Sequence, residues 1–383
     1  MPGSLKTAVA TAAYLSGADR LLAALAERRR EPIVLGYHRV VDDFASEAAC
    51  SFPAMLVSRR MLERHLDWIG RRCHVVSVDD LRTCVESPRR SARPVAAITF
   101  DDGYRDVYEH AMPLLVKKGL PAAVFVTTNY VSTADVHPHD QLYLLLVRAS
   151  KQWDSFSHEL CRLLGALHAP LSPVAFADAS RSVHGALRML LTTLPQREVR
   201  RVIDALDRSV GLAEPMPSGF RAMTWEMVRD MSRRGFVIGS HTQSHCLLTN
   251  EDRATVAEEI SSSQRVLEEQ LGRRVTSFAY PDGRFDTAAV RAVADGGYRI
   301  AFTTCRHRDA EHPWLTVPRM LLWERSTVDS GGRFSPAIMS GQIAGLLPSS
   351  ACGQRHDATP VASESYGERD TGPSRYQRTA PFF

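Results

Sequence analysis

Short apolar runs alternate along most of the chain with longer segments in which apolar residues recur at helical spacing. Residues 95–100 form a nearly continuous apolar run, which is typical of a strand buried on both faces. A helical pattern follows and ends at Gly119, and residues 122–126 form the next apolar run. This order predicts a βαβ unit with parallel strands and a right-handed crossover.

The same alternation returns in the second half of the chain. Further strands are expected at 32–37, 236–239, 275–280, 299–303 and 315–322, with helices between them. About seven strands alternating with helices predict an α/β barrel, in which functional groups gather at the carboxyl ends of the strands. Residues 138–220 break the rhythm because they show helical patterns only, and we interpret them as a helical insertion between two barrel strands.

The two ends of the chain differ from the body at 31–348. Residues 1–30 carry five basic and two acidic residues and predict an amphipathic helix. A helix packed on the body is one interpretation, and a helix lying on an anionic membrane surface is the other. Residues 349–383 are rich in Ser, Gly, Pro, Thr and charged residues, which predicts a disordered tail.

Composition and charge narrow the class of protein. The 383 residues include 47 Lys plus Arg and 43 Asp plus Glu, a formal net charge of +4. So small an excess gives no support to a nucleic-acid partner, and no apolar run approaches the ~18 residues of a membrane span. The seven cysteines are odd in number and form no CxxC pair, which favours reduced thiols. We therefore expect a cytoplasmic enzyme, with peripheral membrane contact through residues 1–30 as an extension; a periplasmic or secreted enzyme is the alternative.

Polar residues that can bind a metal follow two of the predicted strands. Asp101 and Asp102 end the most apolar strand, and Gly103 gives the backbone freedom to turn both carboxylates inward. His241 and His245 follow a later strand, at a spacing that places both imidazoles on one face of a helical turn. Two imidazoles and one carboxylate leave coordination positions open, as catalytic metal sites do, and a second carboxylate can serve as a base. This set of residues favours hydrolysis of an ester or amide.

The same segments carry a resemblance to a known family. The runs ITFDDGY at 98–104 and GSHTQSH at 239–245 resemble the first two motifs of the polysaccharide deacetylases, the NodB-homology group that forms carbohydrate esterase family 4. LGYHR at 35–39 and FAYPDG at 278–283 agree in order and spacing with the supporting segments. The resemblance, over about 32–136 and 221–328, implies a distorted (β/α)7 barrel that removes acetyl groups from N-acetylated sugars. The family's metal is a divalent ion, commonly zinc.

The resemblance also implies a role for individual residues. Asp101 is implied to be the general base. The implied metal ligands are Asp102, His241 and His245. A backbone N–H in the third motif is implied to line the oxyanion hole, which makes Tyr280 and Asp282 the candidates for contact with the substrate, an N-acetylated carbohydrate.

Two features depart from the family pattern. Many members hold the base with an Arg at the start of the third motif, where this chain has Ala279, and many supply the general acid from a Leu-x-His segment that is absent between 315 and 325. We hypothesise that His38, at the end of the first strand, is the acid; a histidine satisfied within the core is the alternative. Arg319, on the last strand, is our candidate to pair with Asp101, although a surface or structural arginine fits the sequence equally well.

Several alternatives stay open at this level. His137, His139 and Asp140 begin the insertion, where they either line the cleft or form a polar loop that leads into a helix. Trp314 offers a face for stacking on a sugar, or packs in a wall. Two histidines and one carboxylate also bind Fe(II) in oxygenases, and a binding protein without catalysis is a third class. Hydrolysis of another C–N bond or of an acetate ester remains open within the hydrolase class.

Overall fold

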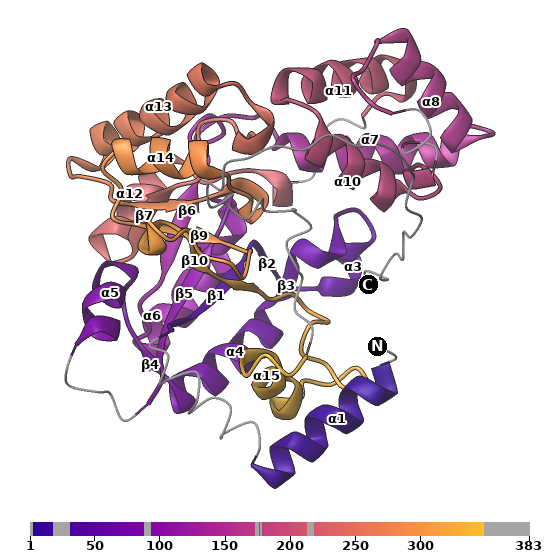
Figure 1. Ribbon diagram of the computed structural model, residues 1–383. Helices are drawn as coiled ribbons and strands as arrows, with labels where there is room; N and C mark the ends of the chain where they lie inside the picture. Colours follow the sequence, from indigo (N-terminus) through magenta and orange to yellow (C-terminus); the bar gives the residue numbers. More distant parts are fainter. Residues whose placement is uncertain are drawn as a thin grey trace, which may run out of the picture. The chain divides into compact units, whose positions relative to one another are not determined.

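Parallel strands form a nearly closed barrel around the apolar core of the protein (Figure 1). The computed structural model describes residues 3–17, 31–87, 93–172, 176, 178–212 and 218–347. The strands of the barrel are β1 (Ile33–Tyr37), β5 (Val95–Phe100), β6 (Ala123–Val126), β7 (Val237–Ser240), β8 (Ser277–Ala279), β9 (Ile300–Thr303), β10 (Val317–Pro318) and β11 (Met320–Leu321). Their order is β10-β9-β8-β7-β6-β5-β1-β11, and β4 (His74–Val75) pairs with β5. The predicted α/β barrel is confirmed.

The barrel closes through one segment that is shared between two neighbours. β10 pairs with β9, β11 pairs with β1, and Arg319 alone separates β10 from β11. The backbone N–H of Arg319 donates to Thr303 O at 2.7 Å, which continues the ladder to β9. The single strand predicted at 315–322 is therefore two short strands that together close the ring.

Helices surround the barrel and cover its outer face (Figure 1). They are α4 (Arg59–Arg72), α5 (Val78–Glu86), α6 (Met112–Lys118), α12 (Trp225–Arg233), α13 (Arg253–Leu271) and α14 (Thr287–Asp295). Their ends follow local chemistry, because the Ser58 side chain caps α4 and Gly272, in the left-handed region, ends α13. α3 (Phe44–Ala48) and the two-stranded sheet β2 (Arg39–Val41) and β3 (Leu56–Ser58) complete the first half. Single turns lie at η1 (Pro53–Met55), η2 (Val107–Ala111), η3 (Ser218–Phe220), η4 (Leu248–Asn250), η5 (Pro281–Gly283) and η6 (Pro313–Leu315).

The segment between β6 and β7 contains helices with a hydrophobic core of their own. These are α7 (Pro138–Gln152), α8 (Phe156–Ala166), α10 (Val183–Thr193) and α11 (Gln196–Val210), which lie together in Figure 1. Their buried residues include Leu145, Leu160, Leu190 and Leu206. Hydrogen bonds tie this insertion to the loops above the barrel: Gln196 donates to Ser244 O at 2.9 Å, and Arg200 to the Tyr130 hydroxyl at 2.8 Å.

Near the amino terminus, α1 (Gly3–Ser16) packs on α15 (Pro336–Ile343), where Ala10 is buried against Ala337 and Ile338. The second part of the predicted N-terminal helix, residues 18–30, and the predicted tail at 349–383 lie outside the described residues. Among the helices of the described ranges, none has the length and hydropathy needed to span a bilayer. Reduced thiols, which the cysteine pattern favoured, are found at Cys50, Cys73, Cys84, Cys161 and Cys246, but Cys305 is disulfide-bonded.

Candidate active site

Two adjacent aspartates are buried at the carboxyl end of β5. Asp101 is 2% exposed and Asp102 is fully buried. Successive residues of an extended chain point in opposite directions, but Asp102 and Gly103 both adopt left-handed backbone conformations, with φ of 68° and 72°. The left-handed turn at Asp102 itself, and not only the freedom of Gly103, brings both carboxylates into the interior.

Arg319 binds the first of these carboxylates with both ends of its guanidinium. Nη1 donates to Asp101 Oδ1 at 2.7 Å and Nη2 to Oδ2 at 2.6 Å, while Nη1 also donates to the Thr99 hydroxyl at 3.1 Å. The guanidinium lies against the rings of Phe125 and Phe302. The pairing hypothesised from the sequence is thus present as a bidentate contact, and it comes from the strand segment that closes the barrel.

Asp101 is held in its ionised form by its neighbours. Burial alone would raise the pKa of its carboxyl group, but the Arg319 guanidinium and then His241 lower it, so that the pKa lies below its ordinary value. A carboxylate that is ionised at neutral pH is ready to accept a proton, as a general base must.

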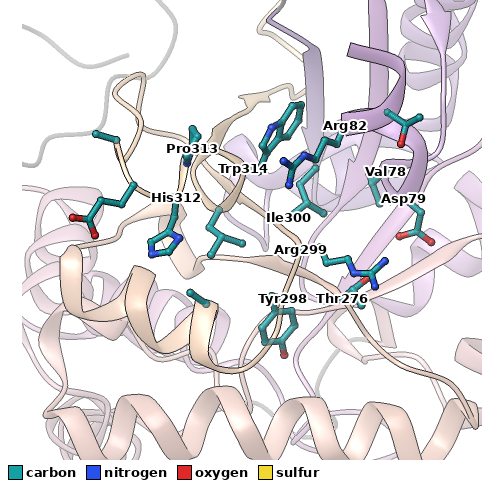
Figure 2. Close-up of a pocket in the computed structure, with 15 residues that line it drawn as sticks. Val78, Asp79, Arg82, Thr276, Tyr298, Arg299, Ile300, His312, Pro313 and Trp314 are labelled. Carbon is teal, nitrogen blue, oxygen red and sulfur yellow. The ribbon is translucent and has the colours of Figure 1, made fainter. Parts of the chain in front are cut away.

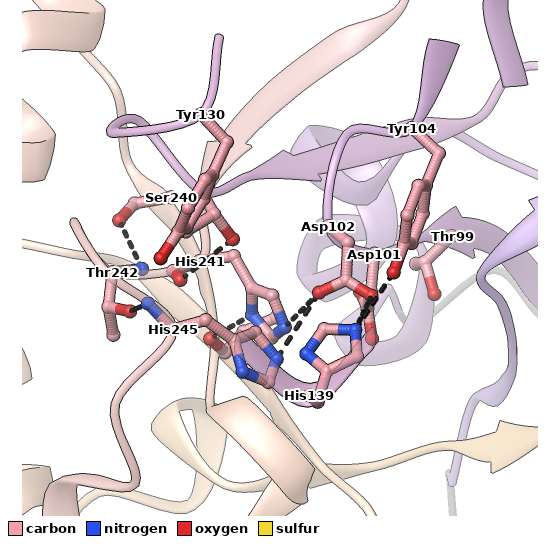
Figure 3. A network of polar contacts seen from close by, with 12 residues as sticks. Thr99, Asp101, Asp102, Tyr104, Tyr130, His139, Ser240, His241, Thr242 and His245 are labelled. Atoms are coloured by element: carbon pink, nitrogen blue, oxygen red, sulfur yellow. Dashed lines mark hydrogen bonds and ion pairs between the residues drawn. The ribbon is translucent and has the colours of Figure 1, made fainter. Parts of the chain in front are cut away.

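Asp102 and two histidines form a group that could hold a metal ion (Figure 3). Asp102 Oδ1 lies 3.5 Å from His241 Nε2 and 3.2 Å from His245 Nε2, and the three ligand atoms lie within 4.8 Å of one another. Within the described part of the chain, neither Asp102 oxygen has a hydrogen-bond partner. A buried carboxylate without such partners is costly, and a divalent cation between the three side chains would compensate its charge.

The protonation states of His241 and Asp102 suit metal binding, whereas the pKa of His245 lies above its ordinary value because Asp102 outweighs burial, so a metal ion would have to displace a proton there. Burial lowers the pKa of His241 to about 4, and the pKa of Asp102 lies well below its ordinary value because its neighbouring histidines outweigh burial. His241 Nδ1 lies 2.8 Å from Ala279 O, which directs Nε2 towards Asp102. A neutral imidazole and an ionised carboxylate are the forms that bind metals.

The loop that carries both histidines is not the helical turn that their spacing predicted. Thr242 and His245 have positive φ values of 66° and 62°, and the Thr242 hydroxyl accepts a hydrogen bond from the His245 N–H at 3.0 Å. Glu259 of α13 accepts from the N–H groups of Gln243 and Ser244, both at 2.9 Å. The two imidazoles therefore meet through an irregular loop that side chains hold in shape.

The start of the insertion lies buried beside Asp102, and not in an exposed polar loop. His137 is fully buried, His139 is 9% exposed and Asp140 is 1% exposed. The Tyr104 hydroxyl lies 2.8 Å from His139 Nε2 and donates to Asp140 Oδ2 at 2.5 Å. The sequence signalled these residues only as a polar cluster, because nothing in their spacing ties α7 to β5.

His38 and the third motif lie around the same centre. His38 directly follows β1, is half-buried, and is among the groups that lower the pKa of Asp101. The Tyr280 N–H donates to Phe302 O in the barrel ladder and is not available to a substrate. Asp282, at φ 54°, keeps an N–H for which the described residues give no acceptor, so Asp282 is the better oxyanion candidate of the two.

A separate cavity of about 1110 Å³ lies at the amino ends of β8 and β9, away from the carboxyl ends that carry the aspartates and histidines (Figure 2). Trp314 lines it, and its indole N–H donates to Glu86 at 2.8 Å. Arg82 and Arg308 both lie against the Trp314 ring. Trp314 is therefore part of this wall and not of the site around Asp102.

Comparison with known proteins agrees with the resemblance in the sequence. The family model described as polysaccharide deacetylase matches residues 89–163 and 176–301. YxkH of Bacillus subtilis (strain 168), which is named as a polysaccharide deacetylase, is 18% identical over 252 residues, or 66% of this chain. The match spans 60% of that relative's own length.

A solved structure shares the fold. The deacetylase PplD of Streptococcus pyogenes, solved in complex with acetate, matches with a TM-score of 0.50 and 16% identity, over 81% of this chain and 96% of that chain. IcaB from Ammonifex degensii matches with a TM-score of 0.48 and 18% identity, over 82% and 97% of the two chains. At such identities, the likeness to PplD supports the barrel fold alone.

Proposed function

The chain belongs to the polysaccharide deacetylase family, and from that premise we propose that it is a metal-dependent hydrolase of N-acetylated sugars. Its substrate is an acetylated residue of a polysaccharide, an oligosaccharide or a glycolipid precursor. The observation that carries this proposal is the pair of buried aspartates, one held by Arg319 and the other facing two histidines. An ionised base beside a metal-binding group is what amide hydrolysis requires.

Asp102, His241 and His245 are the side chains that would hold the metal. When bound, a divalent ion, for which we propose zinc, supplies a Lewis acid beside the acetyl group. The three protein ligands leave room for the substrate.

Asp101 accepts the proton of the water that attacks the acetyl carbonyl. Arg319 occupies both carboxylate oxygens in the resting site and so fixes their direction. To the Asp282 N–H, for which the described residues give no acceptor, we assign the role of donating to the carbonyl oxygen as negative charge develops on it. His38, beside this centre, is our proposed donor of a proton to the departing amine, because no histidine follows in residues 315–325.

His38→Gln tests the last of these roles. We expect acetate release to fall by about 10²–10⁴-fold while the metal content stays near that of the wild type, because a general acid contributes to turnover and not to metal binding. Turnover equal to that of the wild type would exclude His38 as the acid.

The other function classes fit the site less well. An Fe(II) oxygenase has no use for a base held at Asp101, next to the metal-binding carboxylate. A binding protein without catalysis gains nothing from burying that carboxylate together with Arg319. Hydrolysis of an acetate ester uses the same groups and is distinguished by the choice of substrate.

For the compartment, we propose a cytoplasmic enzyme of glycan assembly, with residues 1–30 as a peripheral membrane contact. A processed amino terminus on protein from a periplasmic or secreted fraction would contradict this.

To test the function, the purified protein is incubated separately with N-acetylglucosamine oligomers, with N-acetylated glycolipids and with an O-acetylated sugar. The acetate and the free amine that are released are then measured. We expect equal amounts of acetate and amine from an N-acetylated substrate, loss of both after chelation, and recovery with Zn²⁺. Acetate from the O-acetylated sugar alone would favour the esterase, and no acetate from any substrate would refute the hydrolase.

A further inference from the structure

The peptide bond between Ser244 and His245 is held by side chains on both sides. Its N–H donates to the Thr242 hydroxyl at 3.0 Å (Figure 3). Its carbonyl oxygen accepts from Gln196 Nε2 at 2.9 Å and from the Tyr130 hydroxyl at 3.4 Å. Because Gln196 is the first residue of α11, one of the two donors to this carbonyl comes from the insertion and not from the barrel.

This peptide bond determines the backbone conformation of a residue that could hold the metal. His245 has a φ of 62°, in the left-handed region that residues with a Cβ seldom adopt. Such a conformation persists only where the surrounding structure holds it. The hydrogen bonds on both sides of the peptide bond provide that support, so the place of the His245 imidazole, whose Nε2 lies 3.2 Å from Asp102 Oδ1, depends on them.

A second attachment ties the turn between α10 and α11 to the segment that follows the histidine loop, residues 241–245. The Gln196 N–H donates to Glu251 Oε1 at 2.6 Å, and Asn250 Nδ2 donates to Leu194 O at 3.1 Å. The Gln196 side chain thus extends towards the histidine loop from a backbone that is itself anchored.

Arg200, one turn further along α11, supports the other donor to the same carbonyl. Its Nη2 donates to the Tyr130 hydroxyl at 2.8 Å, and an arginine side chain has no acceptor. The single hydrogen of the Tyr130 hydroxyl is therefore left for Ser244 O. Both donors to this carbonyl depend on α11, Gln196 directly and Tyr130 through Arg200.

We propose that Gln196 and Arg200 are positioning residues of the metal centre, which hold the peptide bond before His245 and with it the imidazole. The inference rests on the proposed metal centre and adds the insertion to the elements that set its affinity. Glu259 of α13 holds N–H groups of the histidine loop, whereas Gln196 holds a carbonyl group of that loop from the insertion. The insertion therefore contributes to metal affinity although it supplies none of the three proposed ligands.

Titration of the full-length protein with Co²⁺, after bound metal has been removed with a chelator, tests the proposal. The visible absorption of the bound ion gives the dissociation constant. For Gln196→Ala we expect that constant to rise about 10–100-fold, the range found when a metal ligand loses its support. Gln196→Glu should give at least as large a rise, because a carboxylate of similar shape cannot donate to Ser244 O. Arg200→Leu should give a smaller rise, since Arg200 acts only through Tyr130.

Gln152→Ala is the matched control. Gln152 Nε2 donates to Val210 O at 3.5 Å, a contact between α7 and α11, so this substitution removes a similar hydrogen bond within the insertion and leaves the histidine loop untouched. Its dissociation constant should equal that of the wild type. Urea unfolding of the metal-free variants gives the second measurement. A merely structural role of Gln196 would lower the free energy of unfolding and leave the dissociation constant unchanged.

The proposal is overturned if Gln196→Ala and Gln196→Glu bind Co²⁺ with the wild-type dissociation constant, or if Gln152→Ala raises that constant equally. If Gln196→Ala does not fold, Tyr130→Phe, which keeps the aromatic ring and removes the other donor to Ser244 O, is judged by the same two criteria.

This result is separable from the outcome for the proposed function, because Co²⁺ binding is measured without a sugar. Acetate release together with a dissociation constant that is unchanged in Gln196→Ala would refute this inference alone. A constant that depends on Gln196 in a protein that releases no acetate would refute the deacetylase and support the inference. A wild type that binds no Co²⁺ would refute the metal centre and this inference with it.

Discussion

At the scale of single residues, buried ionisable side chains provide the proposed catalytic groups, and the free energy of unfolding depends strongly on them. Asp101 and Arg319 form an ion pair in which both partners are nearly inaccessible to water. A buried pair of this kind gains little over an apolar pair of the same volume, but either partner left alone is expensive. Under the proposed function, the need for an ionised base at Asp101 explains this pair better than stability does.

Arg319→Leu is expected to lower the free energy of unfolding by about 3–5 kcal/mol, because it leaves the Asp101 carboxylate buried without its partner. The double variant Asp101→Leu with Arg319→Leu should recover most of that loss. The exposed pair Arg265 and Glu269, at 3.1 Å, provides the control, and Arg265→Leu should change stability by less than about 1 kcal/mol. Urea unfolding measures the free energy of unfolding of all three variants. An equal loss of that free energy in Arg319→Leu and in the double variant would show that the unpaired Asp101 carboxylate is not the cause.

His65 gives the fold a dependence on pH that is unrelated to the site. It is fully buried between the Tyr37 and Thr327 hydroxyls, and burial lowers its pKa to about 3. In the unfolded chain the imidazole takes up a proton near pH 6.5, whereas in the folded protein it stays neutral. Stability from this residue is therefore full above pH 6.5 and is lost as the pH falls towards 3.

Between pH 7 and pH 5 the wild type should lose about 2 kcal/mol more of its unfolding free energy than His65→Gln, from about 1.4 kcal/mol for each pH unit below 6.5. Urea unfolding at the two pH values measures this difference. His74→Gln, at an exposed histidine, controls for the substitution itself. If the wild type and His65→Gln lose the same unfolding free energy between pH 7 and pH 5, His65 takes up its proton equally in the folded and unfolded states.

At the scale of elements, the loop between His241 and His245 shows where sequence reasoning reaches its limit. The spacing of the histidines predicted correctly that they share one centre, but it predicted a helical turn, and two residues with positive φ form the loop instead. What holds this shape is Glu259, which lies on α13 and accepts from two N–H groups and the Ser244 hydroxyl. Side-chain contacts between distant segments leave no periodic signal in the chain.

Glu259→Gln is expected to weaken metal binding by about 10–100-fold, because a carboxamide cannot accept all three hydrogen bonds and the loop would no longer hold the imidazoles in register. Glu259 is in this sense a positioning residue. Glu258→Gln is the matched control, since Glu258 is the exposed neighbour on the same helix and bonds only within that helix. Equal dissociation constants in the wild type and Glu259→Gln, measured by metal titration, would show that the loop needs no such support.

At the scale of the whole molecule, the barrel was predictable, and the packing of the insertion against the site was not. Runs such as 95–100 are apolar throughout because both faces of the strand are buried, and that pattern is local. The pattern at 315–322 placed Arg319 on the last predicted strand, and the arginine missing from the third motif suggested its pairing with Asp101, which the structure shows. His139 and Asp140 were only a polar cluster in the sequence, because the packing of α7 on the loop after β5 depends on the arrangement of the complete fold.

The most direct test of the account compares acetate release by the wild type and by Asp101→Asn, both loaded with Zn²⁺ and both with their metal content measured. We expect the variant to keep its metal, since Asp101 is not among the proposed ligands, and its turnover on the N-acetylated substrate to fall by about 10²–10⁴-fold, since an amide cannot accept the proton. Turnover at the wild-type rate in a metal-loaded Asp101→Asn protein would contradict the central claim that this carboxylate is the base.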